Sequence, residues 1–204
     1  QLGLRHAITQ VLGPELSRRV QFVKDEAGLP PEGRPSSAQT ARGLRVGGLH
    51  TRAGGVYVVT DTVRTPEQAV WTAIHEVAGH GGMAGLVDRF GHLASDGEGL
   101  RPLFTKAREA LLTNPTVKAL ADRIAAERGA TDLPRMAEEA AAELQAARVS
   151  GRWDRLAQRY GVDVPEALRT GGDTALSGWK RVLHRIVNAS AENGASSFAG
   201  RLSS

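Results

Sequence analysis

Two histidines lie five positions apart in this sequence, with a glutamate directly after the first, in the stretch His75-Glu76-Val77-Ala78-Gly79-His80. Successive residues of an α-helix turn by about 100°, so residues five apart point about 140° away from each other. The two imidazoles therefore converge only if the helix contains one extra residue, as in a π-helical turn. Because glycine tolerates unusual backbone angles, we predict that Gly79 lowers the cost of this distortion.

The residue types in this stretch are those of a catalytic zinc site. Neutral imidazoles are good zinc ligands, and a nearby carboxylate serves as a base for the water that the metal activates. The familiar zinc-protease pattern places its histidines four residues apart, one fewer than here. Glu76 is the expected general base, which takes a proton from the water and later donates it to a leaving amine. The alternative is a surface His-Glu-His stretch that binds no metal.

The sequence before the motif predicts a well-defined helix. Thr65-Pro66-Glu67-Gln68 combines an N-cap, a proline at the first helical position and a capping-box residue. An apolar stripe at helical spacing then runs from Ala69 to Val77. This buried helix favours a metal site over a surface stretch.

A third protein ligand is needed, and downstream acidic residues are the candidates: Asp88, Asp96, Glu98, Glu109, Asp122, Glu127, Glu138, Glu139 and Glu143. The segment 138–143 stands out, because Glu139 and Glu143 are four residues apart and share one helical face. The alanines beside them permit close packing of another helix. The same pattern is typical of a solvent-exposed helix face. The segment is the leading candidate only because a helix that supplies two histidine ligands needs a third ligand from elsewhere in the chain.

The two segments together resemble the paired motifs of dipeptidyl peptidase III, H-E-x-x-G-H and E-E-x-x-x-E. The resemblance covers these segments alone. It implies zinc bound by His75, His80 and Glu139, with Glu76 as the catalytic base. It also implies that Glu138 and Glu143 orient the histidines.

The strand before the motif, the capped helix, the motif itself and the later Glu-Glu helix also look like a metallopeptidase module. Such modules occur within very large multidomain proteins of phages and related mobile elements. The helix around residues 179–183 fits this resemblance, whereas Gly81-Gly82-Met83 replaces the aromatic residue that often follows the motif. The chain also lacks an initiating Met, so we expect it to be part of a larger polypeptide.

The sequence predicts an α+β fold, with a small N-terminal sheet followed by a mainly helical, zincin-like part. We expect one domain over residues 1–190, with the sheet region at 1–64, the helical region at 65–190 and a flexible tail at 191–204. Strands are predicted at 20–24, 44–46, 49–51 and 56–60. Helices are predicted at 2–12, where Gly13-Pro14 ends the helix, and at 102–112, 115–128, 133–149, 153–160, 165–169 and 175–189.

Composition narrows the classes of function. The 204 residues contain no cysteine, which excludes thiolate ligands and disulfides, and no signal peptide or membrane span is apparent. We therefore expect a cytoplasmic protein, or one delivered into a host cell as part of a larger chain. The net charge of +4 comes from scattered arginines. We expect no nucleic-acid or membrane partner.

Peptide hydrolysis also needs a hydrogen-bond donor for the oxyanion. Tyr57, His92, Tyr160 and His184 are candidates that the sequence does not rank, and for each of them a structural role is the favoured alternative. His6 and His50 lie in unremarkable contexts. In zincin-type proteases a sheet edge above the metal helix pairs with extended substrate, and the strand at 56–60 is placed for this use. The alternative, which is compatible with it, is that 56–60 is simply a core strand.

The sequence thus predicts a zinc metallopeptidase that acts on a protein or peptide. The alternatives are an inactive structural or interaction module of a larger protein, and a zinc hydrolase with a non-peptide substrate.

Overall fold

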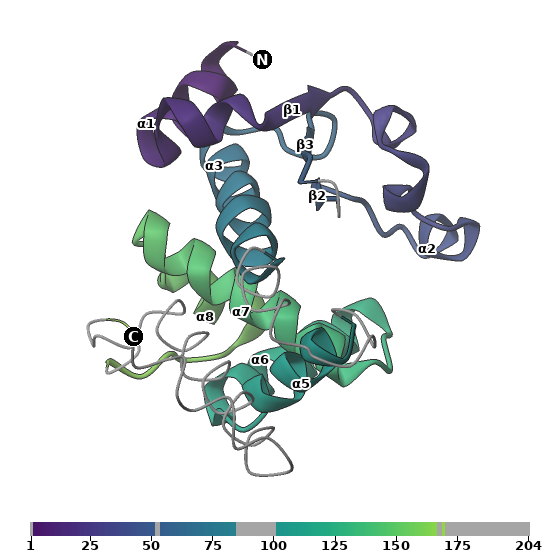
Figure 1. The fold of residues 1–204 in the computed structure, drawn as a ribbon, viewed down its shortest axis with the longest axis vertical. Coiled ribbons are helices and arrows are strands. Elements are labelled where there is room, and N and C mark those ends of the chain that lie inside the picture. The colour runs from purple at the N-terminus through teal and green to yellow at the C-terminus, as the bar shows by residue number, and fades with distance from the viewer. Residues whose placement is uncertain (1, 52–53, 85–100, 167–168, 170–204) are drawn as a thin grey trace, which may run out of the picture.

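The structure is a computed structural model that describes residues 2–51, 54–84, 101–166 and 169 (Figure 1). It has the predicted α+β architecture, with a small sheet and a larger helical part. The strands are β1 (Val20–Val23), β2 (Gly48–His50) and β3 (Val56–Val59). The α-helices are α1 (Leu2–Arg18), α2 (Ser37–Ala41), α3 (Pro66–Ile74), α5 (Arg101–Leu111), α6 (Pro115–Arg128), α7 (Leu133–Ser150) and α8 (Asp154–Tyr160). Two 3₁₀ turns, η1 (Glu26–Gly28) and η2 (Pro31–Gly33), follow β1, and a π-helix, η3 (His75–His80), continues α3.

The sheet has the order β1-β3-β2, so β3 is its central strand. β1 pairs with β3 in parallel, with Val20 opposite Val56, and β2 pairs with β3 antiparallel, with His50 opposite Val56. The strand predicted at 44–46 does not form, and residues 24–47 instead make an extended arm between β1 and β2. This order makes β1 and β2 the two edge strands of the sheet.

The first helix continues past its predicted end. Gly13 has a non-helical backbone with a φ of 77°, which breaks the helix where the sequence predicts. Pro14 then begins a second helical segment that runs to Arg18, because proline is well suited to the first position of a helix. The chain therefore leaves the helical conformation at Gly13, kinks, and resumes it from Pro14.

Capping residues set the starts of the helices that build the site. The Thr65 side chain accepts from the Gln68 backbone N–H, and the Gln68 side chain accepts from the Thr65 N–H, which forms the predicted capping box of α3. Asn114 caps α6 and Asp132 caps α7. Glycines in the left-handed conformation, Gly129 and Gly151, end these two helices.

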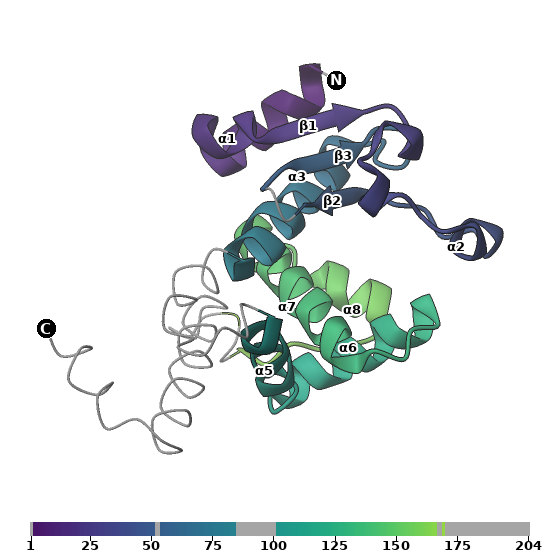
Figure 2. The same cartoon turned by 45° about the vertical axis from the view of Figure 1, so that its right-hand side comes forward.

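Helix α3 is buried on two sides, because it lies between the sheet and α7 (Figures 1 and 2). Ala69 and Ala73 pack with the valines of the sheet and with Ile8 of α1. Trp71 and Ile74 belong to a second cluster, formed mainly with α5, α6, α7 and α8. This helix thus joins the two halves of the core and carries the motif to their boundary.

Some predictions lie outside the described residues. They include the helix at 175–189, residues 167–168 of the short helix at 165–169, and the tail at 191–204. Within the described part of the chain, no helix combines the length and apolar character needed to cross a membrane.

Gly79 has a packing role in place of the predicted conformational one. Positive φ values in the described residues are confined to other glycines, namely Gly13, Gly43, Gly54, Gly129, Gly151 and Gly161. A Cβ added at Gly79 would lie 2.7 Å from the Cα of Ala142 on α7 and would clash with the Ala142 side chain. The missing side chain therefore lets η3 and α7 approach closely enough for their polar groups to meet.

We predict that Gly79→Ala lowers the free energy of unfolding by about 1–3 kcal/mol, because the added methyl group overpacks a backbone contact. The matched control is Gly82→Ala, since a Cβ at Gly82 meets nothing within 4 Å. Urea denaturation of the metal-free variants measures both. Equal stability of the two variants would contradict a packing role for Gly79.

Candidate metal centre

The spacing of the two histidines is accommodated by a π-helix, as the sequence predicts. The backbone N–H of Gly81 donates to the carbonyl of Glu76, five residues earlier. Residues five apart are stacked on neighbouring turns in this geometry. The rings of His75 and His80 consequently come together, with their centroids 5.0 Å apart.

Both imidazoles present Nε2 to the carboxylate of Glu139 on α7. His75 Nε2 lies 3.5 Å from one Glu139 oxygen, and His80 Nε2 lies 3.6 Å from the other. One ligand atom from each of the three residues falls within 4.8 Å of the others. Two atoms bound at about 2.0–2.2 Å to one tetrahedral ion lie about 3.4 Å apart, so these residues can hold a metal ion.

The other nitrogen of each ring lies beside a second glutamate. His80 Nδ1 is 2.8 Å from a Glu138 oxygen, and His75 Nδ1 is 3.8 Å from a Glu143 oxygen. A carboxylate on the far nitrogen of a ligating histidine fixes its tautomer and orientation. Both histidines therefore have the partners that metal-binding histidines usually have, and the three glutamates of α7 take distinct positions.

Glu143 is itself anchored from two directions. The Trp71 indole N–H donates to one oxygen at 2.9 Å, and the Tyr160 hydroxyl donates to the other at 3.1 Å. Glu143 as a whole is 5 % exposed. A buried carboxylate needs such donors, and here they also hold it against His75.

Each α7 glutamate also has an arginine partner from a different helix. Arg108 of α5 donates from Nε to Glu138 at 2.7 Å. Arg128 of α6 contacts Glu139 at 2.9 Å, and Arg159 of α8 approaches Glu143 at 3.8 Å. These arginines, which the sequence analysis did not single out, balance much of the negative charge of the site.

The charges around the histidines shift their protonation. Burial alone would lower the pKa of His80, but the contacts with Glu138 and Glu139 outweigh it and raise that pKa well above 6.5. The pKa of His75 is raised in the same way by Glu139, Glu76 and Glu143, against the effect of burial. Burial would raise the pKa of Glu139, yet His75, His80 and Arg128 hold it well below 4.5. Without a metal, the site is therefore a tightly paired cluster of charges.

Glu76 differs from the other glutamates of the site. Its side chain is buried, with 7 % of the residue exposed, and it makes no hydrogen bond or ion pair within the described part of the chain. Burial raises its pKa, which the nearby His75 and His80 only partly oppose. A buried, unpaired carboxylate is costly for a fold, and such groups concentrate at functional sites.

Strand β2 lies along the π-helix and contributes a residue that the sequence analysis did not select. A Cβ at Gly48 would lie 3.0 Å from the Glu76 carboxylate, and a Cβ at Gly81 would lie 3.2 Å from Nε2 of His50. Gly48 and His50 share one face of the strand, because side chains alternate along it. The imidazole of His50 has no hydrogen-bond partner among the described residues. Its nitrogens are therefore available to a ligand on the side of the site where His80 lies.

The remaining sequence-predicted ligands do not meet the histidines. Asp122 pairs with Lys118, Glu127 pairs with Arg159, and Glu109 is exposed. Asp88, Asp96 and Glu98 lie outside the described residues. Of the nine acidic candidates, the structure therefore brings the 138–143 segment to the histidines.

The described residues that the sequence predicts as oxyanion donors are not placed for that role. Tyr160 is buried and donates to Glu143. Tyr57 pairs with Leu49, and this pair alternates with the residues of β2 and β3 that face α3 and η3. His92 and His184 lie outside the described residues. Neither described candidate is therefore available to a substrate at the site.

The prediction that residues 56–60 form a sheet edge is wrong. β3 pairs on both sides, with β1 and with β2, and so offers no free backbone to another strand. Strand order depends on long-range pairing, which the local sequence does not encode. The edge strand beside the motif helix is β2.

No protein-family model, curated protein or solved structure matches this chain. What the chain does is therefore inferred from the geometry and chemistry of the site.

We predict that the metal-free protein loses stability as the pH rises above about 6.5. The pKa of His80 is raised in the folded state, so its contribution is fully present below the unfolded value of about 6.5 and is lost as the pH passes through the folded value. Zinc reverses this trend, because the metal competes with protons for the same nitrogens. Urea denaturation from pH 6 to 9, with and without zinc, measures both slopes.

The control for this prediction is His80→Gln, which should flatten the slope of the metal-free protein. Stability of the metal-free wild type that stays constant or rises over this range would contradict the charge-paired arrangement of His80, Glu138 and Glu139.

Proposed function

We propose that this chain is a zincin-like, zinc-dependent metallopeptidase domain, with His75, His80 and Glu139 as ligands and Glu76 as general base. Two histidines and one glutamate are a donor set typical of catalytic zinc. Bound zinc would acidify a water and polarise the carbonyl of a substrate. The rest of the chemistry is supplied by side chains of this chain.

The proposal rests on Glu76, whose largely buried side chain has no hydrogen-bond or ion-pair partner among the described residues. A structural metal site has no use for a fourth, buried carboxylate without a partner, whereas hydrolysis needs a base beside the water. Its raised pKa brings it closer to the range in which a carboxylate accepts and returns a proton at neutral pH. Glu76 would take the proton from the attacking water and deliver it to the leaving amine.

The α7 glutamates would hold the ligands in position during this reaction. Glu138 would orient the ring of His80 through its hydrogen bond to Nδ1, whereas Glu143, 3.8 Å from Nδ1 of His75, would act on that ring through its charge, so that Nε2 of each ring stays available. The spacing of these groups also supports the resemblance to the paired motifs of dipeptidyl peptidase III.

The edge of β2 that is unpaired among the described strands favours a peptide as the substrate over other classes of molecule. No described strand pairs with its outer edge, so its backbone can pair with an extended peptide. The contacts of Gly48 with Glu76 and of His50 with Gly81 place this strand along the site. A peptide added to the edge would run past the metal ligands and the base.

We expect Glu76→Gln to bind zinc with unchanged stoichiometry and to lose cleavage of a peptide library by at least about 10²-fold, because the variant cannot accept a proton. His75→Ala should lose both zinc and activity. Metal analysis and peptide cleavage measure the two properties separately. Undiminished cleavage by Glu76→Gln refutes the assigned base, and a zinc-loaded wild type that cleaves no peptide refutes the peptidase.

His50 is the described residue best placed to donate to the carbonyl oxygen in this reaction. Burial, together with His80, lowers its pKa, so the imidazole is neutral at neutral pH. His50→Ala should lower kcat by about 10²–10³-fold without changing zinc content. Tyr57→Phe is the control, because Tyr57 lies on the opposite face of the sheet, and an equal loss in both variants would contradict this role.

A further inference from the structure

The charge balance of the site favours an anionic substrate. Arg108, Arg128 and Arg159 pair with the three α7 glutamates, which leaves Glu76 as the one glutamate of the site without a described partner. Arg159 also pairs with Glu127, so a divalent cation bound by neutral histidines would offset the charges of Glu76 and Glu127. Any exposed arginine without an ion-pair partner near the site would then be excess positive charge. Positive potential in a partly buried site attracts and retains anionic groups.

Arg128 lies at the boundary between the metal ligands and solvent. Its Nη2 contacts the Glu139 oxygen that lies 3.5 Å from His75 Nε2, and its side chain is 40 % exposed. A guanidinium has five N–H donors, and this contact uses one of its nitrogens. Arg128 can therefore hold Glu139 and offer donors to a second carboxylate.

Arg42, in the arm of residues 24–47, places its guanidinium beside the end of α6 that carries Arg128. A Cβ added at Gly129 would lie 2.6 Å from Nη1 of Arg42, so this guanidinium rests on the residue that follows Arg128. Arg42 is exposed and makes no ion pair with any described residue. Its position brings a second arginine, one without an ion-pair partner among the described residues, to the α6–α7 corner.

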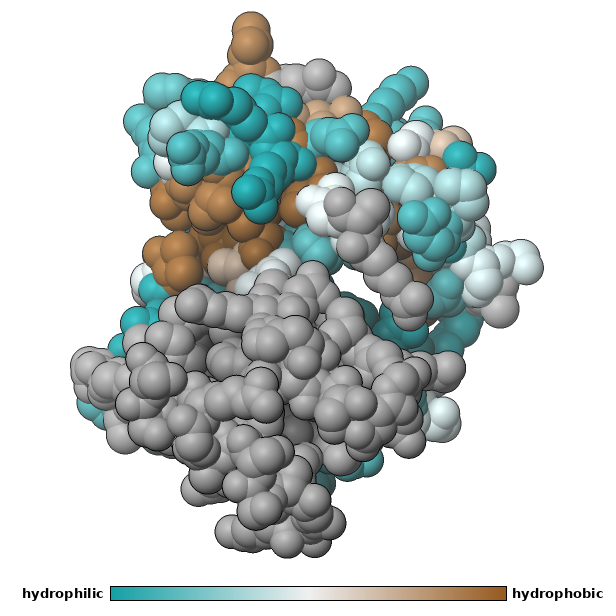
Figure 3. Space-filling model, in the orientation of Figure 1, coloured by the Kyte–Doolittle hydropathy of each residue, from teal (hydrophilic) through white to brown (hydrophobic). Residues whose placement is uncertain are grey.

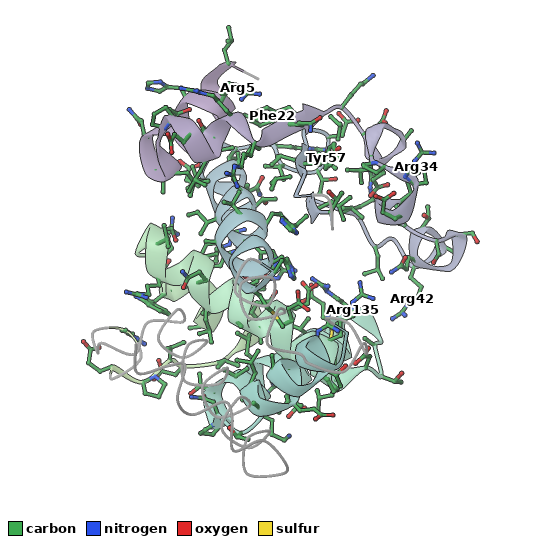
Figure 4. All side chains as sticks on the ribbon, in the orientation of Figure 1. Arg5, Phe22, Arg34, Arg42, Tyr57 and Arg135 are labelled. Carbon is green, nitrogen blue, oxygen red and sulfur yellow. The ribbon has the colours of Figure 1, made fainter. Side chains whose placement is uncertain are left out.

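Arg135 adds a third charge on α7. It precedes Glu139 by four residues and therefore lies on the same face of the helix, one turn away. Its side chain is exposed and has no ion-pair partner in the described residues. Figure 4 shows Arg42 and Arg135 on two sides of the space between the arm and the helices. In Figure 3 the arm side of the molecule is mainly hydrophilic, whereas hydrophobic surface gathers beneath α1.

We propose that Arg42, Arg128 and Arg135 bind carboxylates of the substrate, so that this site selects acidic peptides. The inference rests on the proposed peptidase function and adds its substrate class. Arginine pairs with carboxylates through two parallel hydrogen bonds, which gives direction as well as charge. The carboxylates come from Glu and Asp side chains or from the C-terminus of the peptide.

The test measures peptide binding in the absence of cleavage. Zinc-loaded Glu76→Gln and the metal-free wild type are titrated with fluorescent Glu-rich peptides and with Gln-matched peptides. Each peptide is made with a free and with an amidated C-terminus. We expect the Glu-rich peptide to bind at least about tenfold more tightly than its Gln match, and the difference to shrink as salt is added. Loss on amidation alone assigns the bound carboxylate to the C-terminus.

The double variant Arg42→Gln/Arg135→Gln should reduce binding of the acidic peptide by about tenfold. Arg18→Gln is the matched control, because Arg18 is an exposed arginine at the end of α1. The proposal is overturned if the Gln-matched peptide binds equally, or if the control loses as much affinity as the double variant. Tighter binding of an oligonucleotide of equal charge also overturns it. Failure of the peptidase would instead appear as absent cleavage by the wild type, whatever the binding result.

Discussion

The close approach of η3 to α7 is the contact on which the rest of the site depends. Gly79 lies directly against Ala142, and no larger residue fits between the two backbones. This approach brings the histidines of one helix against the glutamates of the other. Because the π-helical turn stacks His75 over His80, a single carboxylate, Glu139, faces both rings. Packing of two small residues thus positions a polar cluster that neither helix could form alone.

Burial of these charged groups destabilises the fold unless they are paired, and contacts within the cluster supply most of the pairing. Four glutamates and two histidines lie together in a largely buried space, where unpaired charges are unfavourable. Three of the glutamates are satisfied by arginines, histidines, Trp71 and Tyr160. Glu76 alone lacks a described partner. A metal ion that binds the histidines and Glu139 would replace their mutual pairing and add its binding free energy to stability.

Local features of the fold were readable from the sequence because they depend on near neighbours. Capping residues such as Thr65 and Asn114 mark helix starts, and the His75–His80 spacing requires the π-helix if the rings are to converge. Features that depend on distant contacts were not readable. The central position of β3 follows from pairing with β1 and β2, and the true role of Gly79 appears only once α7 packs against it.

The same distinction applies to the site. The segment 138–143 was identifiable from its pattern and its resemblance to a known motif. His50, Arg42 and Arg128 carry no local pattern, because their positions depend on how the sheet edge, the arm and the end of α6 meet the motif helix. Pro14 shows the limit even for local rules, since the same residue can end one helical segment and begin the next.

The most direct test of the account is calorimetric titration of zinc into the metal-free protein. We predict one zinc per chain, a loss of affinity on Glu139→Ala, and a smaller loss of about 10–100-fold on Glu138→Ala or Glu143→Ala, whose side chains act through the histidines. Zinc binding that survives Glu139→Ala unchanged, or that depends more on Glu138 or Glu143, would contradict the assignment of His75, His80 and Glu139 as the metal ligands.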